Sequence, residues 1–399
     1  MRRIPPLLLA LTLAAGGIVA LVANASSGGH RPSGAASGPR LSSTVAASSP
    51  TPPVSTTVAP TTSTPVTTTT ALVTTTPVAT PAPTAQARSA AAVEPVPVPS
   101  RPPTLAGCPP APRPPGPPPP APWHPAILVP DSAIPAETAP APWTTHPAAV
   151  SGKGMWVWEL PQTERGDVAA IVGRAAAAGL RQIWVRVGDS KDGFYAATDL
   201  DALVPAAHRA GIAVIGWGFP YLYDPVADAV WTLDALSWAA PDGSRLDGFS
   251  ADIERASEGV ALSGPRVAAY LETVRRGAGD RMIVATVYPP TDSNWFGDYP
   301  YRVMARYVDA FAPMVYWECT DPAADTAVAL SRLASLRPVH VIGQAFNLAD
   351  VGGRVPSPSA AETEWFLQAA HRGGALGASL WVWQSATPEE WAAVSAYPW

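Results

Sequence analysis

The pattern of hydrophobic and polar positions changes near residue 150. Before that point the chain is of low complexity, apart from one continuous apolar run from Leu7 to Val22. From Gly154 onward, short runs rich in β-branched and aromatic residues alternate with Ala-rich stretches. Runs of the first kind predict buried β-strands, and the Ala-rich stretches are typical of helices. The second part of the chain therefore predicts an α/β fold.

Eight of these runs predict strands, and they cover residues 154–159, 181–189, 212–219, 246–254, 281–288, 308–318, 339–346 and 377–384. Helices are predicted between them, for example over residues 166–179, 265–277 and 359–374, and a last helix is predicted to begin near Pro388. Eight strands, each followed by a helix, in about 250 residues have the count and size of a (β/α)8 TIM barrel. A doubly wound open sheet is the alternative, but eight evenly spaced units favour closure.

A TIM barrel places its active site at the carboxyl-terminal ends of the strands. The last residues of each predicted strand are therefore the candidates for function. They are Glu159, Arg186, Asp189, Trp217, Asp252, Glu254, Tyr288, Tyr316, Glu318, Gln344 and the stretch from Trp381 to Gln384. This set is rich in carboxylates, amides and aromatic rings.

Composition divides the chain at the same place as the hydrophobic pattern. Residues 1–150 hold 33 of the 49 prolines but only three acidic residues, Glu94, Asp131 and Glu137. Such a segment buries too little apolar surface to offset its chain entropy. We expect residues 26–145 to form a disordered Pro/Thr-rich linker and residues 146–399 to form the folded domain.

The first 25 residues resemble an export signal. Arg2 and Arg3 precede the apolar run, and Ala23-Asn24-Ala25 has the small-x-small pattern of a cleavage site. Cleavage after Ala25 and retention as a membrane anchor through residues 7–22 both remain open. Either outcome predicts an extracellular or cell-surface protein.

Charge narrows the class of partner. The first 150 residues carry seven Arg and three acids, which gives +4, and the rest carries 19 basic and 28 acidic residues, which gives −9. An acidic domain without a basic run is a poor match for nucleic acid. We therefore expect a monomer that binds a neutral polysaccharide.

The chain has two cysteines, Cys108 and Cys319. A disulfide between them suits an exported protein, and two unpaired thiols are the alternative.

Several kinds of chemistry lack their usual residues in this domain. His208 and His371 fall in predicted helices and His340 at the start of a strand, so neither a His-based triad nor a His-ligated metal is expected. No phosphate-binding glycine motif follows a strand, so no cofactor is expected. Carboxylates beside aromatic rings remain, and these are the groups that sugar hydrolysis uses.

The strongest pair of carboxylates lies in the segment LDGFSADIE, residues 246–254. Asp252 and Glu254 are two positions apart, so their side chains project from the same face of a strand, together with Ser250. Two neighbouring carboxylates resist simultaneous ionisation, which would keep one of them protonated near neutral pH. Capping of the next helix, or pairing with Arg255, is the structural alternative.

This segment is similar to the DxxDxDxE motif that family 18 glycoside hydrolases, the chitinases and their relatives, carry on the fourth strand of a (β/α)8 barrel. Asp247, Asp252 and Glu254 match three of its four marked places, and Ser250 stands where the family has Asp. Two further segments resemble motifs of strands six and eight, namely Met314-Val315-Tyr316-Trp317 for MxY[DN] and Gly377 to Trp381 for Gly-xxx-Trp.

The resemblance implies a glycoside hydrolase that acts on an N-acetylhexosamine polysaccharide, such as chitin or peptidoglycan. By this resemblance Glu254 would protonate the glycosidic oxygen, Asp252 would support attack by the substrate's N-acetyl group, and Tyr316 would bind that group. Trp381 would form the floor of the sugar site. The other strand-end residues expected to bind substrate are Trp217, Glu318, Gln344, Glu159 and Tyr288.

Two other interpretations stay open. The short DIE segment also resembles the strand-four motif of family 25 muramidases, with Glu159 as a second acid, although Gln384 stands where that family has an acid on strand eight. A non-catalytic carbohydrate-binding or cell-wall barrel is the alternative from another class, because Ser250 and Gln384 are the kind of replacement that removes activity.

Overall fold

The structure is a computed structural model that describes residues 10–14, 17–21, 125, 127–347 and 357–399. The predicted linker up to residue 124 lies outside the described residues, as does much of the predicted signal segment. Within that segment, β1 (Ala10–Ala14) and β2 (Gly17–Leu21) pair as an antiparallel two-stranded sheet. None of the helices in the described part of the chain is both long and apolar enough to cross a bilayer.

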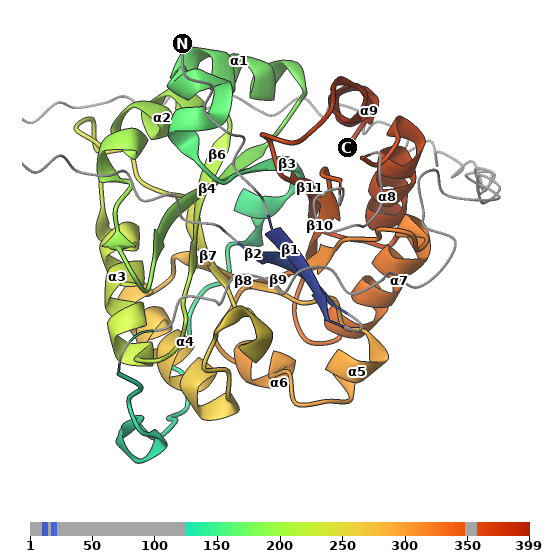
Figure 1. Ribbon diagram of the computed structural model, residues 1–399. Coiled ribbons are helices and arrows are strands. Elements are labelled where there is room, and N and C mark those ends of the chain that lie inside the picture. The colour runs from blue at the N-terminus through green and yellow to red at the C-terminus, as the bar shows by residue number, and fades with distance from the viewer. Residues whose placement is uncertain (1–9, 15–16, 22–124, 126, 348–356) are drawn as a thin grey trace, which may run out of the picture. The chain divides into compact units, whose positions relative to one another are not determined.

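The folded domain is a closed barrel of parallel strands, with the short strand β5 (Gly193–Phe194) paired to its second strand (Figure 1). Each strand pairs with its neighbour in the chain, and the first strand pairs with the last, which closes the ring. The strands are β3 (Gly152–Val157), β4 (Gln182–Asp189), β6 (Ala213–Phe219), β7 (Gly248–Asp252), β8 (Met282–Val287), β9 (Ala310–Val315), β10 (His340–Gln344) and β11 (Gly377–Trp381). The predicted TIM barrel is confirmed, and the open sheet is excluded by the closing pairs.

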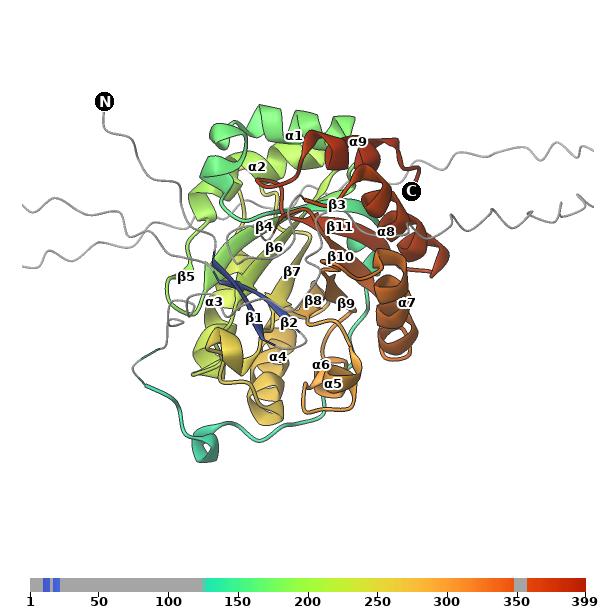
Figure 2. The same cartoon turned by 45° about the vertical axis from the view of Figure 1, so that its right-hand side comes forward.

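Helices surround the barrel, as Figure 2 shows from a second direction. Two short helices follow β8, where the other connections carry longer ones. The helices are α1 (Val168–Ala177), α2 (Ala197–Arg209), α3 (Pro225–Ser237), α4 (Gly264–Ala278), α5 (Asp292–Trp295), α6 (Tyr301–Met304), α7 (Pro322–Leu333), α8 (Ala360–Arg372) and α9 (Pro388–Ala396). The four helices predicted from sequence correspond to α1, α4, α8 and α9.

Local sequence fixes where several of these helices begin. Asp224 accepts hydrogen bonds from the first free backbone N–H groups of α3, and Asp321 does the same for α7. Ser359 and Thr387 begin α8 and α9 with capping boxes, in which the side chains of Glu362 and Glu390 return the bond. These caps satisfy donors that a helix leaves unpaired at its start.

Tryptophan rings fill the inside of the barrel. Trp156 and Trp184, opposite one another on β3 and β4, stack with ring centroids 4.7 Å apart. The indole N–H of Trp156 donates to Ser379 Oγ at 2.8 Å, so burial leaves no orphaned donor there. His340, at the start of β10, lies beneath them and contacts Ser379 and the Val150 carbonyl through its two ring nitrogens.

The chain ahead of β3 runs along the outside of the barrel, and Arg266 of α4 holds it. The buried guanidinium of Arg266 donates to the Val129 carbonyl and, at 2.7 Å, to Asp131. It also donates to the carbonyls of Leu222 and Tyr223 in the loop after β6. One buried side chain therefore joins this segment to a loop at the carboxyl-terminal end of the strands.

A second contact of this segment lies at the amino-terminal end of β9. The indole N–H of Trp143 donates to Asp309 at 2.8 Å, and Arg275 forms a buried ion pair with the same carboxylate at 2.7 Å. Arg275 also stacks on the Trp143 ring. The sequence placed the start of the domain at residue 146, whereas contacts with the barrel begin at Val129.

Candidate active site

Side chains at the end of β7 alternate as the sequence predicts. Ser250, Asp252 and Glu254 are buried on one face, and the Ser250 hydroxyl lies 2.8 Å from that of Thr286 on β8. Phe249 points the other way and packs edge-on against Trp231 of α3. The two candidate acids therefore enter the same space, and Ser250 is hydrogen-bonded to the neighbouring strand.

Both acids are enclosed and incompletely paired. Asp252 is 8% exposed and Glu254 is 5% exposed. Oδ1 of Asp252 and Oε2 of Glu254 have no hydrogen-bond partner among the described residues. Neither acid caps the next helical turn, and neither forms an ion pair with Arg255. The purely structural interpretation of the pair therefore lacks the contacts that it needs.

Burial and mutual repulsion set the protonation of this pair. Desolvation raises the pKa of Glu254 well above its usual value, and the negative charge of Asp252 raises it further. Desolvation also raises the pKa of Asp252, against which the positive charge of Arg186 acts. The arrangement favours a proton on Glu254 near neutral pH, as general acid catalysis requires.

Two tyrosines border the acids. The Tyr288 hydroxyl lies 3.5 Å from Oε1 of Glu258, and the charges of Glu254 and Glu258 contribute, after burial, to raising the pKa of that hydroxyl. Tyr316 is half-buried, and the charges of Asp252 and Glu254 contribute, after burial, to raising the pKa of its hydroxyl. Glu254 therefore acts on both tyrosine hydroxyls, Asp252 acts on that of Tyr316, and the roles expected for these side chains stay predictions.

Glu258 belongs to this group, and the sequence analysis missed it. It ends the single turn Ala256–Glu258, labelled η4, that follows the strand, and only 5% of it is exposed. Desolvation raises the pKa of Glu258 to about 7. The DIE motif ends four residues earlier, and no periodic pattern extends to this turn, so no sequence signal marked it.

Arg186 on β4 supplies positive charge near the acids. It forms an ion pair with Asp189 at 2.7 Å, and Asp189 also accepts from the backbone N–H groups of Lys191 and Asp192. Nε of Arg186 is buried without a partner. Arg186 and Asp189 thus form a structural ion pair whose positive end also acts on Asp252.

The two predicted tryptophans differ in accessibility. Trp217 is 2% exposed and donates to the Val157 carbonyl, so it fills the barrel. Trp381 is half-buried at the end of β11, with its ring edge-on to Trp217 at 5.2 Å. The peptide bond after Trp381 is cis. Of the two rings, Trp381 is the one with surface left for a ligand.

Gln344 holds the turn after β9. It is fully buried, its amide oxygen accepts from the backbone N–H of Glu318 at 2.9 Å, and its amide nitrogen donates to the Phe346 carbonyl. Glu318 has φ +44°, a left-handed conformation that costs energy for a side chain other than glycine. Gln344 therefore uses both amide atoms on the backbone, and Glu318 stays half-buried at the rim.

Glu159 lies on the opposite side of the barrel from this turn. Its side chain accepts from Gln162, and its carbonyl accepts from the side chain of Gln384 at 3.1 Å. Gln384 also donates to Thr163. Glu159 therefore sits half-buried in a local network at the ends of β3 and β11.

Two residues of the matched motifs point away from the acids. Asp247 accepts from His208 of α2 and from the Val214 backbone at the amino-terminal end of β7. Trp317 packs on Phe366 of α8 and donates to Glu362. Both residues contact helices or backbone outside the barrel interior.

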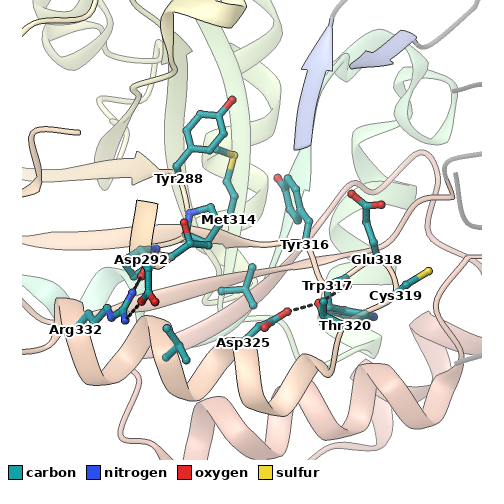
Figure 3. A pocket seen from close by; sticks show the side chains of 15 residues that line it. Tyr288, Asp292, Met314, Tyr316, Trp317, Glu318, Cys319, Thr320, Asp325 and Arg332 are labelled. Carbon is teal, nitrogen blue, oxygen red and sulfur yellow. Dashed lines mark hydrogen bonds and ion pairs between the residues drawn. The ribbon is translucent and has the colours of Figure 1, made fainter. Parts of the chain in front are cut away.

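A pocket of about 520 Å³ opens beside the tyrosines, between the loops after β8 and β9 and helix α7 (Figure 3). Tyr288, Tyr316 and Glu318 point the same way, away from the helix that carries Asp325 and Arg332. The volume lies in the range of sites for small ligands. Neither Asp252 nor Glu254 lines this pocket, so the tyrosines are the link between it and the acids.

Cys319 also lines this pocket and is disulfide-bonded. Its expected partner, Cys108, lies outside the described residues, so the pairing stays a prediction. Within the described ranges no group of three or more His, Cys, Asp or Glu side chains could hold a metal ion.

No protein-family model and no curated protein matches the sequence. Among solved structures, the chain is similar to a chitinase from Chromobacterium violaceum, with 14% identity, TM-score 0.47, and 62% of this chain and 100% of that one covered. It is also similar to a mutant plant class V chitinase from Cycas revoluta in complex with (GlcNAc)3, with 9% identity, TM-score 0.46 and coverage of 61% and 99%.

A putative alpha-L-fucosidase from Bacteroides thetaiotaomicron is similar too, at 11% identity, TM-score 0.44 and coverage of 58% and 85%. The expected likeness to family 18 chitinases is thus present at the level of structure. Identities and TM-scores this low say nothing about activity, and the barrel rests on its own strand pairing.

Proposed function

We propose that this protein is an exported or surface-anchored glycoside hydrolase that cleaves a polysaccharide containing N-acetylhexosamine. The observation that supports this most directly is the pair Asp252 and Glu254. These acids share one face at the end of a barrel strand, are buried, and keep carboxyl oxygens that no group in the described part of the chain satisfies. Groups left unpaired at such cost are typical of sites that bind a ligand.

In the first step Glu254 donates its proton to the glycosidic oxygen, and the bond from that oxygen to the anomeric carbon breaks. The carbonyl oxygen of the substrate's N-acetyl group attacks the same carbon and forms a cyclic, positively charged intermediate. Asp252, whose charged form Arg186 favours, stabilises the acetamido N–H, and Tyr316 hydrogen-bonds the group. Water then opens the ring, Glu254 takes its proton, and the configuration is retained.

This route does not need a second protein nucleophile. Strands β10 and β11 end in Gln344 and Trp381, and neither is a carboxylate. Asp189 is paired with Arg186, so Glu159 and Glu318 are the other acids at strand ends and the candidates for a base if the N-acetyl group does not take part. A substrate without that group separates the two routes.

A non-catalytic carbohydrate-binding barrel is the second candidate. It is favoured by the position of the described pocket, which neither Asp252 nor Glu254 lines. In that case Trp381 and Tyr316 would hold the sugar, and Glu254 would contribute only to affinity.

The test is hydrolysis by the full-length protein, which keeps Cys108 together with the contacts of Arg266 and Trp143. Chitin oligomers, peptidoglycan and an unacetylated glucan are the substrates, and product is measured by mass spectrometry. We expect cleavage of acetylated substrates only, with retained configuration by NMR and inhibition by a thiazoline mimic of the cyclised intermediate. Cleavage of the glucan, or inverted product, contradicts substrate assistance.

Glu254→Gln separates enzyme from binder, and Glu389→Gln is the matched control. Glu389 is exposed on α9, so its substitution should leave turnover unchanged. Loss of product in Glu254→Gln with binding retained supports the hydrolase. Binding without product in the unsubstituted protein favours the carbohydrate-binding barrel.

A further inference from the structure

Glu258 is a third carboxylate beside the two candidate acids. Its turn is closed by hydrogen bonds from the Glu258 and Val260 backbones to the Arg255 carbonyl, and Gly259, with φ +83°, ends the turn. A left-handed φ of this kind suits glycine, which has no Cβ to clash. The turn brings the Glu258 side chain back toward the two candidate acids, although Glu258 lies outside β7.

Tyr288 is shared between Glu254 and Glu258. Its hydroxyl lies 3.5 Å from Oε1 of Glu258, and the nearby charge of Glu254 acts on the same hydroxyl. A phenol has one proton to donate, so it cannot donate to both carboxylates at once. If Tyr288 donates to Glu258, its oxygen can accept a bond from Glu254 only when Glu254 carries a proton.

Other partners do not satisfy the remaining oxygens. Oδ1 of Asp252, Oε2 of Glu254 and Oε2 of Glu258 are all buried and without a partner in the described part of the chain. Arg186 is already paired with Asp189, and Arg255 lies over the Tyr288 ring at 5.4 Å. Three acids with so little positive charge must retain protons among themselves.

We propose that Glu258 is a positioning residue that, through Tyr288, keeps the shared proton on Glu254. Its negative charge opposes ionisation of Glu254, and its demand on the Tyr288 hydroxyl leaves Glu254 as the donor in the chain Glu254–Tyr288–Glu258. On the other side Arg186 favours the charged form of Asp252. The consequence for hydrolysis rests on the proposed function, whereas the protonation of Glu254 does not.

Desolvation and the charges of Asp252 and Glu258 raise the pKa of Glu254, whereas a bond donated by Tyr288 would lower it. Donation by Tyr288 to Glu258 instead therefore agrees with a proton on Glu254. The charged and titratable groups that surround Glu254 and Glu258 come from five strands and their loops. They are Asp252 and Arg255 beside β7, Arg186 on β4, Tyr221 after β6, Tyr288 and Tyr299 after β8, and Tyr316 after β9.

Two measurements on the full-length protein test the inference. The first is a ¹³C NMR titration of Glu side-chain carboxyls, with Glu254 assigned through Glu254→Gln. In Glu258→Gln we expect the Glu254 midpoint to fall by about one pH unit or more, because a nearby negative charge has been removed. Glu258→Asp should keep most of the original midpoint, and Glu389→Gln should not change it.

The second measurement is the pH–rate profile on a chito-oligosaccharide. Glu258→Gln should move the alkaline limb to lower pH by a similar amount while keeping the rate at acidic pH within a few fold. A uniform loss at every pH, or an unmoved Glu254 midpoint, would overturn the inference. Should Glu258→Gln fail to fold, Tyr288→Phe tests the same chain, and an unmoved midpoint there also overturns it.

The two proposals fail in different ways. If no substrate is cleaved but the Glu254 midpoint still moves in Glu258→Gln, the hydrolase is wrong and the role of Glu258 stands. If substrate is cleaved and neither the midpoint nor the limb moves, the hydrolase stands and the role of Glu258 is wrong.

Discussion

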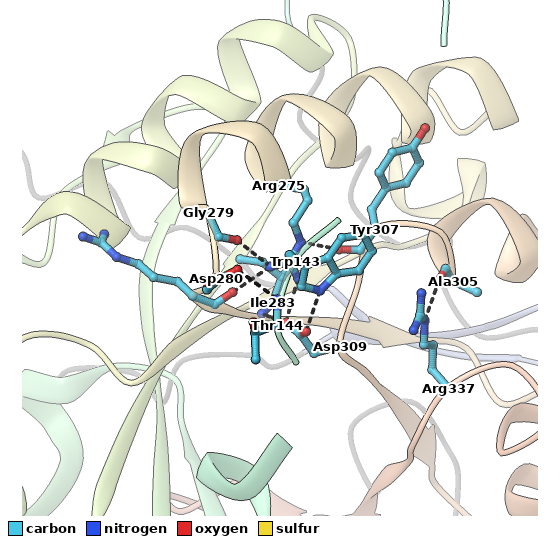
Figure 4. Close-up of polar contacts among 11 residues, drawn as sticks. Trp143, Thr144, Arg275, Gly279, Asp280, Ile283, Ala305, Tyr307, Asp309 and Arg337 are labelled. Atoms are coloured by element: carbon cyan, nitrogen blue, oxygen red, sulfur yellow. Dashed lines mark hydrogen bonds and ion pairs between the residues drawn. The ribbon is translucent and has the colours of Figure 1, made fainter. Parts of the chain in front are cut away.

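Asp309, at the amino-terminal end of β9, and Asp252, at the carboxyl-terminal end of β7, are buried aspartates of the same barrel with opposite surroundings. Asp309 accepts from Arg275, from the Ile283 backbone and from Trp143 (Figure 4). In the described part of the chain, one carboxyl oxygen of Asp252 has no hydrogen-bond partner, and the carboxylates of Glu254 and Glu258 lie nearby. One carboxylate is saturated with donors, whereas the other is left short of them.

The difference separates two uses of a buried charge. A saturated ion pair fixes elements in place, and removing one partner costs much because the other is left unpaired. An unsaturated carboxylate lowers the stability of the empty protein and gains partners only when a ligand arrives. We expect substitutions at the amino-terminal end to reduce stability, and substitutions at the carboxyl-terminal end to reduce activity.

The largest effect is expected from Glu254→Gln. Loss of a positioned acid should reduce the rate of hydrolysis by about 10²–10⁴. The free energy of unfolding at pH 8 should not decrease, because Gln removes a charge that burial disfavours. Kinetic assays and urea unfolding measure the two quantities. A variant that loses stability as well as activity would place Glu254 with Asp309 as a structural acid.

The next effect is expected from Asp309→Ala, which leaves Arg275 buried without its partner. We expect a loss of about 3–5 kcal/mol in the free energy of unfolding. Asp298→Ala, at an exposed aspartate, is the control and should change stability by about 0.5 kcal/mol or less. Equal losses in the two variants would contradict the structural role of Asp309.

Trp143→Phe tests the contacts of Asp309 with a smaller change, because it removes one hydrogen bond and leaves the ion pair with Arg275 in place. An aromatic ring is kept at residue 143, but the hydrogen bond from the indole N–H to the buried carboxylate of Asp309 is lost. This loss should cost about 1.5–3 kcal/mol in the free energy of unfolding. Trp238→Phe is the matched control, since no hydrogen bond from that indole is present in the described structure. If both variants unfold at the same denaturant concentration, the hydrogen bond from Trp143 to Asp309 contributes no stability.

A smaller effect should appear in the pH dependence of stability at the carboxyl-terminal end. Burial raises the pKa of Glu258 from an ordinary value of 4.5 to about 7. The protonated form is thus favoured by folding, so its contribution is full below pH 4.5 and is lost as the pH rises through about 7. Between these values the melting temperature of Glu258→Gln should fall less than that of the unsubstituted protein.

The smallest effect should have the opposite sign, at the amino-terminal end. Burial lowers the pKa of His340 from 6.5 to about 4. The neutral form is favoured by folding, so its contribution is present above pH 6.5 and is lost as the pH falls through about 4. In thermal melts His340→Gln should remove this acid-side decline. An unchanged decline would assign it to other groups.

The strand positions could be predicted because each strand is a short apolar run between helical stretches. The alternation of side chains along a strand also placed Ser250, Asp252 and Glu254 on one face of residues 246–254. The exposure of these strand-end side chains to solvent could not be predicted in this way. Gln344 ends β10 as expected and Trp217 lies two residues before the end of β6, but Trp217 fills the barrel and Gln344 binds backbone. A position at a strand end fixes the end of the barrel, not access to solvent.

Two features escaped the sequence for different reasons. Glu258 enters the site through a tight turn, and its direction depends on backbone angles that no periodic pattern reveals. Residues 127–145 have the proline content of a linker, yet a few separated side chains, among them Trp143, bind them to the barrel. Composition averages over a segment and cannot detect contacts that single residues make.

Arg266 gives the domain a mechanical property. Its guanidinium binds the incoming chain at Val129 and Asp131 and, at the same time, the carbonyls of Leu222 and Tyr223, next to Tyr221. Tension applied to the chain ahead of these residues would therefore be carried first by one arginine. Part of that force would be transmitted to the loop after β6, which carries Tyr221. If the domain works at the end of a tether, its point of attachment and this loop at the carboxyl-terminal end of the barrel respond to the same pull.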